Sequence, residues 1–256
     1  MKITIITVSY NSEKTITRTI ESVLQQNHPH LEYIIIDGSS KDKTVDIAHS
    51  YEGKFKEKDI TYKVLSEPDK GIYDAMNKGI ALASGEIIGI LNSDDRYVDE
   101  NVLISVANAF ESNSSLDTCY GNLLYVKDEK PYRYWKSGHP RTFKFGWMPP
   151  HPSFFVRTSV YEKYGFFRLD CGVNADYELM LRFFEKHKVS SQWIDKLFVY
   201  MEAGGTSNQG IQSRIDGLHN DLLAWEKNGI APTLFCLLLK KLRKIPQFML
   251  AKFTIF

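Results

Sequence analysis

The chain has 256 residues, 43% of them hydrophobic and 25% charged, and a formal net charge of +1. This is ordinary globular composition, and a charge so close to zero excludes binding of nucleic acid by overall charge. The three cysteines match no zinc or disulfide spacing, which predicts a reducing compartment; they are Cys119, Cys171 and Cys236. A polar second residue predicts no signal peptide, and no apolar run reaches the roughly 18 residues of a membrane span.

The first half of the chain alternates between predicted strands and predicted helices. Short β-branched or aliphatic runs predict strands at 3–8, 33–36, 61–66 and 87–91. Apolar residues at helical spacing predict helices capped by Ser12, starting near Asp42, spanning 72–83, and running from Asp99 or Glu100 to Phe110. The Lys-rich stretch 51–59 reads as a polar connection. Strand–helix alternation of this kind builds a parallel sheet.

The second half is less regular. A strand is predicted at 119–126, followed by an aromatic, Pro- and Gly-rich region at 127–152 that is either loop-rich or antiparallel and suits a substrate-facing lid. Further strands are predicted at 153–156 and 192–200, and helices at 159–164, 175–187 and 211–227. The segment 204–207 reads as a flexible glycine-containing junction.

The last 25 residues, 232–256, combine leucine and phenylalanine with lysine and arginine. The segment is too charged to span a bilayer, but a basic amphipathic helix can lie in an anionic membrane interface. Packing against the domain, or a dimer contact, explains the pattern equally well.

Acidic residues follow three successive predicted strands: Asp37, then Glu67 with Asp69, then Asp94 with Asp95. Parallel strands end at one edge of a sheet, where open α/β sheets bind their ligands. One such cluster alone would read as an acidic turn, but three in register predict a site for a divalent cation. The glycine-rich loops that usually hold phosphates are missing, so a bound nucleotide would need a metal to neutralise its phosphates.

Five segments together resemble a known family. They are 5–11, 37–44, 66–79, 91–95 and 174–179, and they occur in the order found in family 2 glycosyltransferases of the GT-A fold, of the type that builds bacterial surface polysaccharides. The resemblance covers about residues 3–207. It implies a single GT-A, Rossmann-like α/β domain with a mostly parallel central sheet.

The resemblance assigns the nucleotide-sugar donor to the first half. Asp37 would contact the base of the nucleotide, with backbone contacts from Ser9 and Tyr10; Ser93, Asp69 and Asn77 would also face the donor, although Asn77 equally suits a role in pinning its helix. Asp94 matches the acidic residue that holds Mg²⁺ or Mn²⁺ on the diphosphate. Asn92 replaces the first acid of that D-x-D pattern, so it would ligate without charge, and Asp95 would orient the site.

The resemblance also implies a catalytic base. Asp176 matches the second residue of the family's E-D pair, whereas Ala175 replaces the glutamate. The implied reaction is inverting: the base takes a proton from an acceptor hydroxyl as that oxygen attacks the anomeric carbon. Position alone would explain Asp176 as an acid favoured by a helix N-terminus.

Three of four further candidate residues have two readings each. His151 suits a metal or diphosphate ligand as well as a buried structural histidine. Trp135 and Trp147 suit either sugar stacking or core packing. Arg214 would reach the diphosphate when a lid closes.

We therefore expect a metal-dependent inverting transferase that uses a nucleotide sugar, most simply a UDP-sugar, and a saccharide or lipid-linked acceptor. Residues 1–118 would bind the donor, 119–207 the acceptor, and 208–256 would form a helical tail. We expect a cytoplasmic enzyme, peripheral on the inner face of the membrane. The alternatives are a non-catalytic nucleotide-sugar-binding protein, favoured by Asn92 and Ala175, and a sugar nucleotidyltransferase, which lacks its usual early glycine-rich loop.

Overall fold

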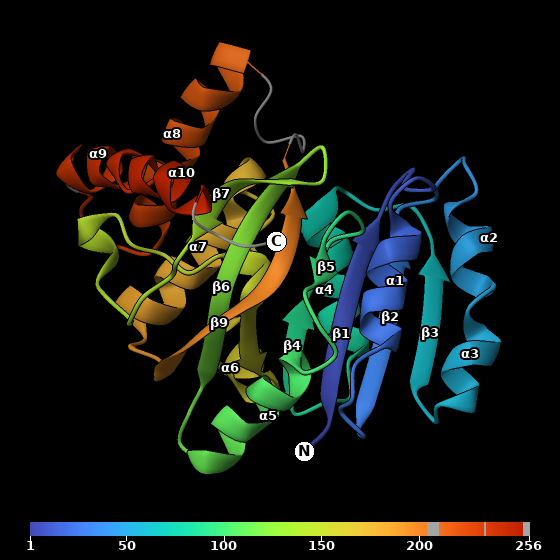
Figure 1. Cartoon of the computed structure of the whole chain (residues 1–256). Helices are drawn as coiled ribbons and strands as arrows, with labels where there is room; N and C mark the ends of the chain where they lie inside the picture. Colours follow the sequence, from blue (N-terminus) through green and yellow to red (C-terminus); the bar gives the residue numbers. More distant parts are fainter. Residues whose placement is uncertain (204–209, 233, 253–256) are drawn as a thin grey trace.

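The structure, a computed structural model, describes residues 1–203, 210–232 and 234–252, without the side chains of 210–216 and 234. One sheet of nine strands runs through the chain (Figure 1). Its strands are β1 (Ile3–Ser9), β2 (Leu31–Asp37), β3 (Thr61–Ser66), β4 (Ile87–Ile90), β5 (Arg96–Tyr97), β6 (Thr118–Lys127), β7 (Lys130–Trp135), β8 (Phe154–Arg157) and β9 (Ser191–Glu202).

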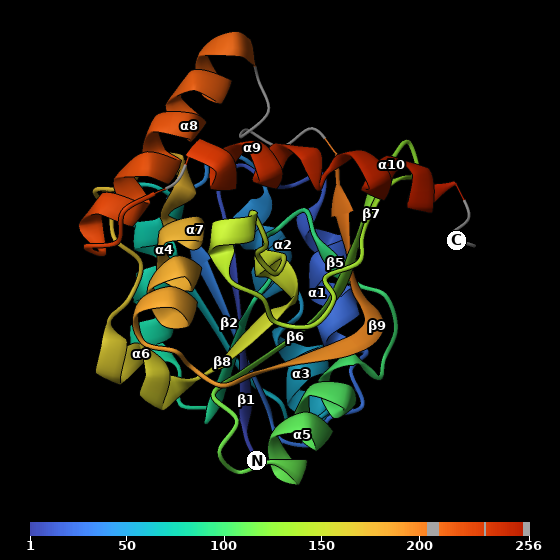
Figure 2. The ribbon, with the colours of Figure 1, turned by 90° about the vertical axis from the view of Figure 1, so that its left-hand side faces the viewer.

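Helices cover both faces of this sheet (Figures 1 and 2). One buried core joins one face to α1 (Ile16–Leu24), α3 (Glu52–Glu57) and α5 (Val102–Ser112), next to α2 (Thr44–His49). The other core joins the opposite face to α4 (Ile72–Leu82), α6 (Thr158–Tyr164) and α7 (Ala175–Leu181). Along β1 the side chains alternate between the two cores, Ile3 and Ile5 entering the first, Ile6 and Val8 the second. The near-continuous apolar strands follow from burial on both faces.

The two halves of the sheet differ in strand direction. Strands β3, β2, β1 and β4 are parallel neighbours, as predicted. Beyond them β8 is antiparallel to β4 and to β6, whereas β6 and β9 are parallel. Strand β6 therefore points the same way as β4, and its carboxyl end lies at the same edge of the sheet. The aromatic region after it begins as an antiparallel hairpin, because β7 folds back on β6.

Three local predictions need correction. The stretch predicted as a polar connection contains α3, a short helix whose only buried residue is Phe55. Helix α1 begins later than predicted: Thr15 is its N-cap, and Ser12 contributes its carbonyl oxygen to Thr15 and Ile16. The predicted helix 175–187 changes from α-helical to π-helical geometry at Arg182.

The C-terminal segment packs back on the domain. It comprises α8 (Gly210–Lys227), α9 (Leu234–Leu242) and α10 (Ile245–Ala251), which cross the upper end of the molecule in Figure 2. Helix α9 lies so close to the turn at Gly146 that a Cβ atom there would collide with the backbone of Lys240. Within the described residues, no helix is long and apolar enough to cross a membrane.

Candidate active site

The predicted edge of carboxylates is present in the structure. In the strand register Ser9 pairs with Asp37, and Asp37 with Ser66, so the ends of β1, β2 and β3 lie side by side. Strand β4 joins them through the pairing of Ile90 with Ile6. The acidic residues that follow these strands therefore share one edge.

Asp37 is fully buried and holds this edge together. Its carboxylate accepts hydrogen bonds from Ser9 Oγ (3.0 Å), Ser66 Oγ (2.7 Å) and the backbone N–H of Ser40 (2.8 Å). The hydroxyl of Ser40 donates to it as well. Three serines from three segments are thus fixed by one carboxylate, which positions the loops around a ligand. Direct contact of Asp37 or Ser9 with a nucleotide stays a prediction.

Tyr10, Gly38 and Asp69 converge at the same place. A Cβ atom on Gly38 would lie 2.5 Å from Asp69 Oδ2 and 3.5 Å from the ring of Tyr10. The Tyr10 ring is 63% exposed, and Asp69 accepts a hydrogen bond from the N–H of Gly71 (2.8 Å). An exposed aromatic ring beside a glycine, where a larger residue would displace the Asp69 side chain, leaves a surface on which a base can stack.

The end of β4 carries a second group of oxygen atoms. Asn92 donates a hydrogen bond from Nδ2 to Asp95 Oδ2 (3.0 Å), while Asn92 Oδ1 and Asp95 Oδ1 are buried without a hydrogen-bond partner. Burial raises the pKa of Asp95 well above its usual range, and the charge of Asp94 adds to this. Burial also raises the pKa of Asp94. Nearby, Ser93 Oγ lies 2.8 Å from Ser12 Oγ.

These atoms fit a hard cation. Divalent magnesium and manganese prefer carboxylate and amide oxygens, and a cation would satisfy two buried oxygens that now have no partner. Among the described residues, no group of three His, Cys, Asp or Glu side chains is arranged to hold a metal by itself. A cation at Asp94 would therefore need Asn92 and further oxygens from a ligand.

Asp176 lies in the first turn of α7, half-buried. Its Oδ1 accepts a hydrogen bond from the hydroxyl of Tyr73 (3.1 Å), which also lies 2.8 Å from the carbonyl oxygen of Val173. Burial raises the pKa of Tyr73 well above its usual range, and the charge of Asp176 contributes. In the part of the chain that the structure describes, no other hydrogen bond to this carboxylate is found, so one oxygen is left for a ligand.

His151 belongs to the neighbourhood of Asp176. Its ring packs edge-on against Phe167, with ring centres 5.5 Å apart. Burial lowers its pKa, and the charge of Asp176 opposes this shift. The side chain of Asn77 binds the backbone of Phe167. Its Nδ2 donates to the Phe167 carbonyl and its Oδ1 accepts from the Phe167 N–H, both at 2.9 Å. Metal binding by His151 and donor binding by Asn77 stay predictions.

Tyr125 is influenced by the charges of both acidic groups. It lies near the end of β6, and burial raises its pKa. The charges of Asp95 and Asp176 both add to that shift, and Arg133 opposes it, so all three groups act on one ring. Sequence reasoning missed Tyr73, Tyr125 and Arg133. The position of Tyr125 at the end of a predicted strand was the available signal.

The remaining candidate residues from the sequence are the two tryptophans and Arg214. Trp147 is core: it is 3% exposed and donates from its indole N–H to the carbonyl of Ser137. Trp135 is half-buried on β7. The junction 204–207 and the side chain of Arg214 lie outside the described residues.

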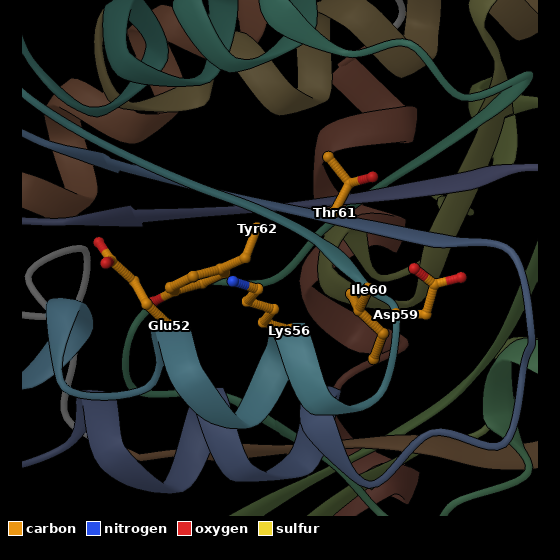
Figure 3. Close-up of a pocket in the computed structure, with 6 residues that line it drawn as sticks. All are labelled: Glu52, Lys56, Asp59, Ile60, Thr61 and Tyr62. Atoms are coloured by element: carbon orange, nitrogen blue, oxygen red, sulfur yellow. The ribbon is translucent and has the colours of Figure 1, made fainter.

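A surface pocket lies elsewhere. Figure 3 shows it between α3 and the beginning of β3. Its lining residues are Glu52, Lys56, Asp59, Ile60, Thr61 and Tyr62. This is the amino end of the strand, opposite the edge that carries the acidic groups, so the pocket is no part of the candidate active site.

Comparison with known proteins agrees with this geometry. The model of glycosyl transferase family 2 matches residues 4–169. The chain belongs to glycosyl transferase family 2. Two similar members come from mycobacteria: an uncharacterized glycosyltransferase of Mycobacterium tuberculosis, Rv1514c, is 33% identical over 70% of this chain and 68% of its own. A PGL/p-HBAD biosynthesis glycosyltransferase of Mycobacterium bovis is 26% identical over 80% and 78%.

Solved structures share the family 2 fold. TarS of S. aureus, residues 1–349 in complex with UDP-GlcNAc, aligns with 98% of this chain and 79% of its own (TM-score 0.64, 19% identity). The chain spans 44% of a longer TarS chain. The mannosyltransferase PcManGT of Pyrobaculum calidifontis, in complex with GDP-Man and Mn²⁺, aligns with 98% and 73% (TM-score 0.67, 16% identity). The GT-A fold predicted from the sequence is confirmed.

Proposed function

We propose that this family 2 glycosyltransferase moves a sugar, with inversion, from a nucleotide-sugar donor to a hydroxyl of a saccharide or lipid-linked acceptor. The observation that carries the proposal is the placement of Asp176. It is a half-buried carboxylate, and one of its oxygens accepts a hydrogen bond from Tyr73. Its negative charge and that of Asp95 both raise the pKa of Tyr125. This common influence on Tyr125 supports a site in which Asp176 accepts a proton near oxygens that would bind a diphosphate-bound cation.

Donor binding is assigned to the edge of β1–β4. The ring of Tyr10 would stack on the base, and Asp69 would accept a hydrogen bond from the nucleoside, while Asp37 keeps Ser9 and Ser40 in place. We favour a UDP-sugar. In support, TarS has been solved with UDP-GlcNAc, although PcManGT was solved with GDP-Man.

Asp94, with Asn92 and Asp95, would hold Mg²⁺ or Mn²⁺. When bound, the cation stabilises negative charge on the leaving diphosphate. The two buried oxygens without partners on Asn92 and Asp95 support this assignment, as does the Mn²⁺ in PcManGT. Asn92 would contribute an uncharged ligand, so affinity for the metal should be lower than with two carboxylates.

Proton transfer is assigned to Asp176. Its carboxylate would take the proton of the acceptor hydroxyl while the oxygen forms a bond to the anomeric carbon and the bond to the nucleoside diphosphate breaks. Attack from the face opposite the leaving group inverts the anomeric centre. Tyr73 would orient the carboxylate through its hydrogen bond to Oδ1.

The experiment that tests this function measures release of nucleoside diphosphate from a panel of UDP-, GDP- and dTDP-sugars, with and without Mn²⁺. A thermal shift by a single donor would identify the nucleotide, because a ligand that binds only the folded state raises its stability. Release that requires Mn²⁺ is expected. Donor binding without release, with every acceptor tried, would favour the non-catalytic alternative.

We also propose that the tail docks on an anionic membrane and that the product belongs to a surface polysaccharide or glycolipid. Seven large apolar side chains of α9 and α10 stay exposed: Phe235, Leu238, Leu242, Ile245, Phe248, Met249 and Leu250. The chain has no acidic residue after Glu226, and four basic ones lie between 240 and 244. Exposed apolar area combined with positive charge suits an anionic interface.

A vesicle assay tests the tail. Leu238→Glu should release the protein from vesicles of phosphatidylcholine and phosphatidylglycerol, because it places a carboxylate in the apolar face. The matched control is Leu169→Glu, at a leucine 49% exposed outside the tail, against 55% for Leu238. Equal vesicle binding by both variants would contradict the proposal.

A further inference from the structure

Arg133 is an arginine buried beside the candidate active site. It lies on β7 directly opposite Tyr125 of β6, and its side chain is 9% exposed. The guanidinium lies 3.8 Å from the centre of the Tyr125 ring, 5.5 Å from that of Trp135 and 5.9 Å from that of Phe248 in α10. No carboxylate among the described residues forms an ion pair with it. Cations are rarely buried without an anion.

A second cation lies at the start of the helix that contacts Arg133, because Lys244 precedes Phe248 of α10 by one turn. Lys244, at the start of α10, forms no ion pair within the described residues and keeps an exposed surface. Partial burial lowers its pKa to about 8, and the positive charges of Arg133 and Lys240 add to that shift. Lys240 itself is neutralised, because its ammonium lies 2.7 and 2.8 Å from the two carboxylate oxygens of Asp221. Within the described residues, Arg133 and Lys244 therefore form a positively charged pair in which neither has an ion-pair partner.

The pair lies away from the donor edge. Strand order places β4, β8 and β6 between β1 and β7, so the pair is on the side where the acceptor and the tail are expected. The Tyr125 ring contacts the Arg133 guanidinium, and the charges of Asp95 and Asp176 act on the same ring. An anion bound here would thus be adjacent to the acceptor hydroxyl rather than to the donor base.

We propose that Arg133 and Lys244 bind a phosphate group carried by the acceptor, next to the hydroxyl that receives the sugar. The guanidinium can donate two parallel hydrogen bonds to phosphate oxygens, and the ammonium adds a mobile charge. This inference rests on the proposed function, since it specifies its acceptor. The phosphate is either part of a lipid in the membrane under the tail or part of a soluble phosphorylated saccharide.

The test measures binding of glycerol 3-phosphate by calorimetry, in the presence of saturating UDP and Mn²⁺ so that the donor site is already filled. Arg133→Gln and Lys244→Gln should each weaken binding about tenfold, the loss expected for one charged hydrogen bond. Lys252→Gln removes the same charge from the tail and should leave the affinity unchanged. Glycerol, which lacks the phosphate, should not bind.

A parallel measurement uses phosphatidylcholine vesicles with and without phosphatidic acid. If the two variants lose binding only to vesicles with phosphatidic acid, the phosphate belongs to a lipid. If they lose binding of glycerol 3-phosphate, a soluble phosphate suffices. Either result supports the proposal. Unchanged binding of both probes in both variants would overturn it and leave Arg133 as a packing residue. UDP affinity is measured separately in every variant: its absence in the wild-type protein counts against the proposed function, whereas its loss in Arg133→Gln alone reports misfolding.

Discussion

The two halves of one sheet edge carry opposite charges. The half built on β1–β4 presents Asp37, Asp69, Asp94 and Asp95, and the half built on β6, β7 and the tail presents Arg133 and Lys244. In the acidic half, serine hydroxyls and a backbone N–H group donate hydrogen bonds to Asp37. Asp95 Oδ1 is buried without a hydrogen-bond partner among the described residues. In the basic half the Arg133 guanidinium packs against the rings of Tyr125 and Phe248.

This difference supports the proposal that the edge binds two ligands, one of which needs a metal ion. A nucleoside diphosphate placed against carboxylates requires a metal ion between the two, because like charges repel. A ligand on the basic half needs no metal. Asp176, in α7, contacts Tyr73 and its charge also acts on Tyr125 of β6. The following changes separate the contributions of the two halves.

Among the changes within the two halves, the largest loss of activity is expected at the candidate metal site. Asp94→Asn keeps the shape of the side chain but removes its charge, and with Asn92 already neutral it leaves only the buried Asp95. We expect transfer to fall on the order of a hundredfold and to need far more Mn²⁺, since metal stabilisation of charge contributes several kcal/mol. Initial rates over a Mn²⁺ titration measure this. Glu100→Gln, an exposed acid six residues further along the chain, is the control. An unchanged Mn²⁺ requirement would show that the acidic half does not hold the cation.

The acidic half was largely predictable from sequence, and the basic half was not. Parallel strands end in register, so Asp37, Asp69 and Asp94 could be placed together from their positions after β-branched runs. Arg133 and Tyr125 meet only because β7 folds back with that register, and Phe248 reaches them from more than 100 residues away. Such pairings depend on tertiary contacts that local patterns do not encode. The helix α3 was missed for a related reason, since one buried Phe55 gives no periodic signal.

The next prediction concerns how Glu32 stabilises the fold and how this depends on pH. Glu32, at the start of β2, is fully buried; burial alone would raise its pKa, but hydrogen bonds from Ser84, Thr4 and Lys63 lower it to about 2. Because the folded-state pKa lies below the unfolded one, this stabilisation is complete above about pH 4.5 and disappears as the pH falls through about 2.

Glu32→Gln should therefore lower the free energy of unfolding at pH 7 by up to ~3 kcal/mol, at 1.36 kcal/mol for each pKa unit. It should also flatten the loss of stability in acid. Urea unfolding at several pH values measures both quantities. Glu86→Gln, an exposed acid at the same end of the sheet, should change neither. A wild-type acid dependence that persists in Glu32→Gln would assign the effect to other carboxylates.

A smaller effect, on donor affinity, is expected where the nucleotide base would stack on Tyr10. Gly38→Ala places a methyl group 2.5 Å from Asp69 Oδ2, so the Asp69 side chain must move and lose its hydrogen bond to Gly71. We expect donor affinity to fall about tenfold, the equivalent of one hydrogen bond, with little change in thermal stability. Gly53→Ala, where the methyl group meets nothing within 4 Å, is the matched control. Equal donor affinity in the two variants would remove Tyr10 and Asp69 from the donor site.

The most direct test of the account is the separation of donor binding from chemistry in Asp176→Asn. This change keeps the hydrogen bond from Tyr73 but removes the proton acceptor. Loss of a general base reduces turnover roughly 10²- to 10⁴-fold. We expect a fall in kcat within that range, with the Kd for the donor and Mn²⁺ unchanged. Turnover within a few-fold of the wild-type value, with the same donor affinity, would contradict the assignment of Asp176 as the base.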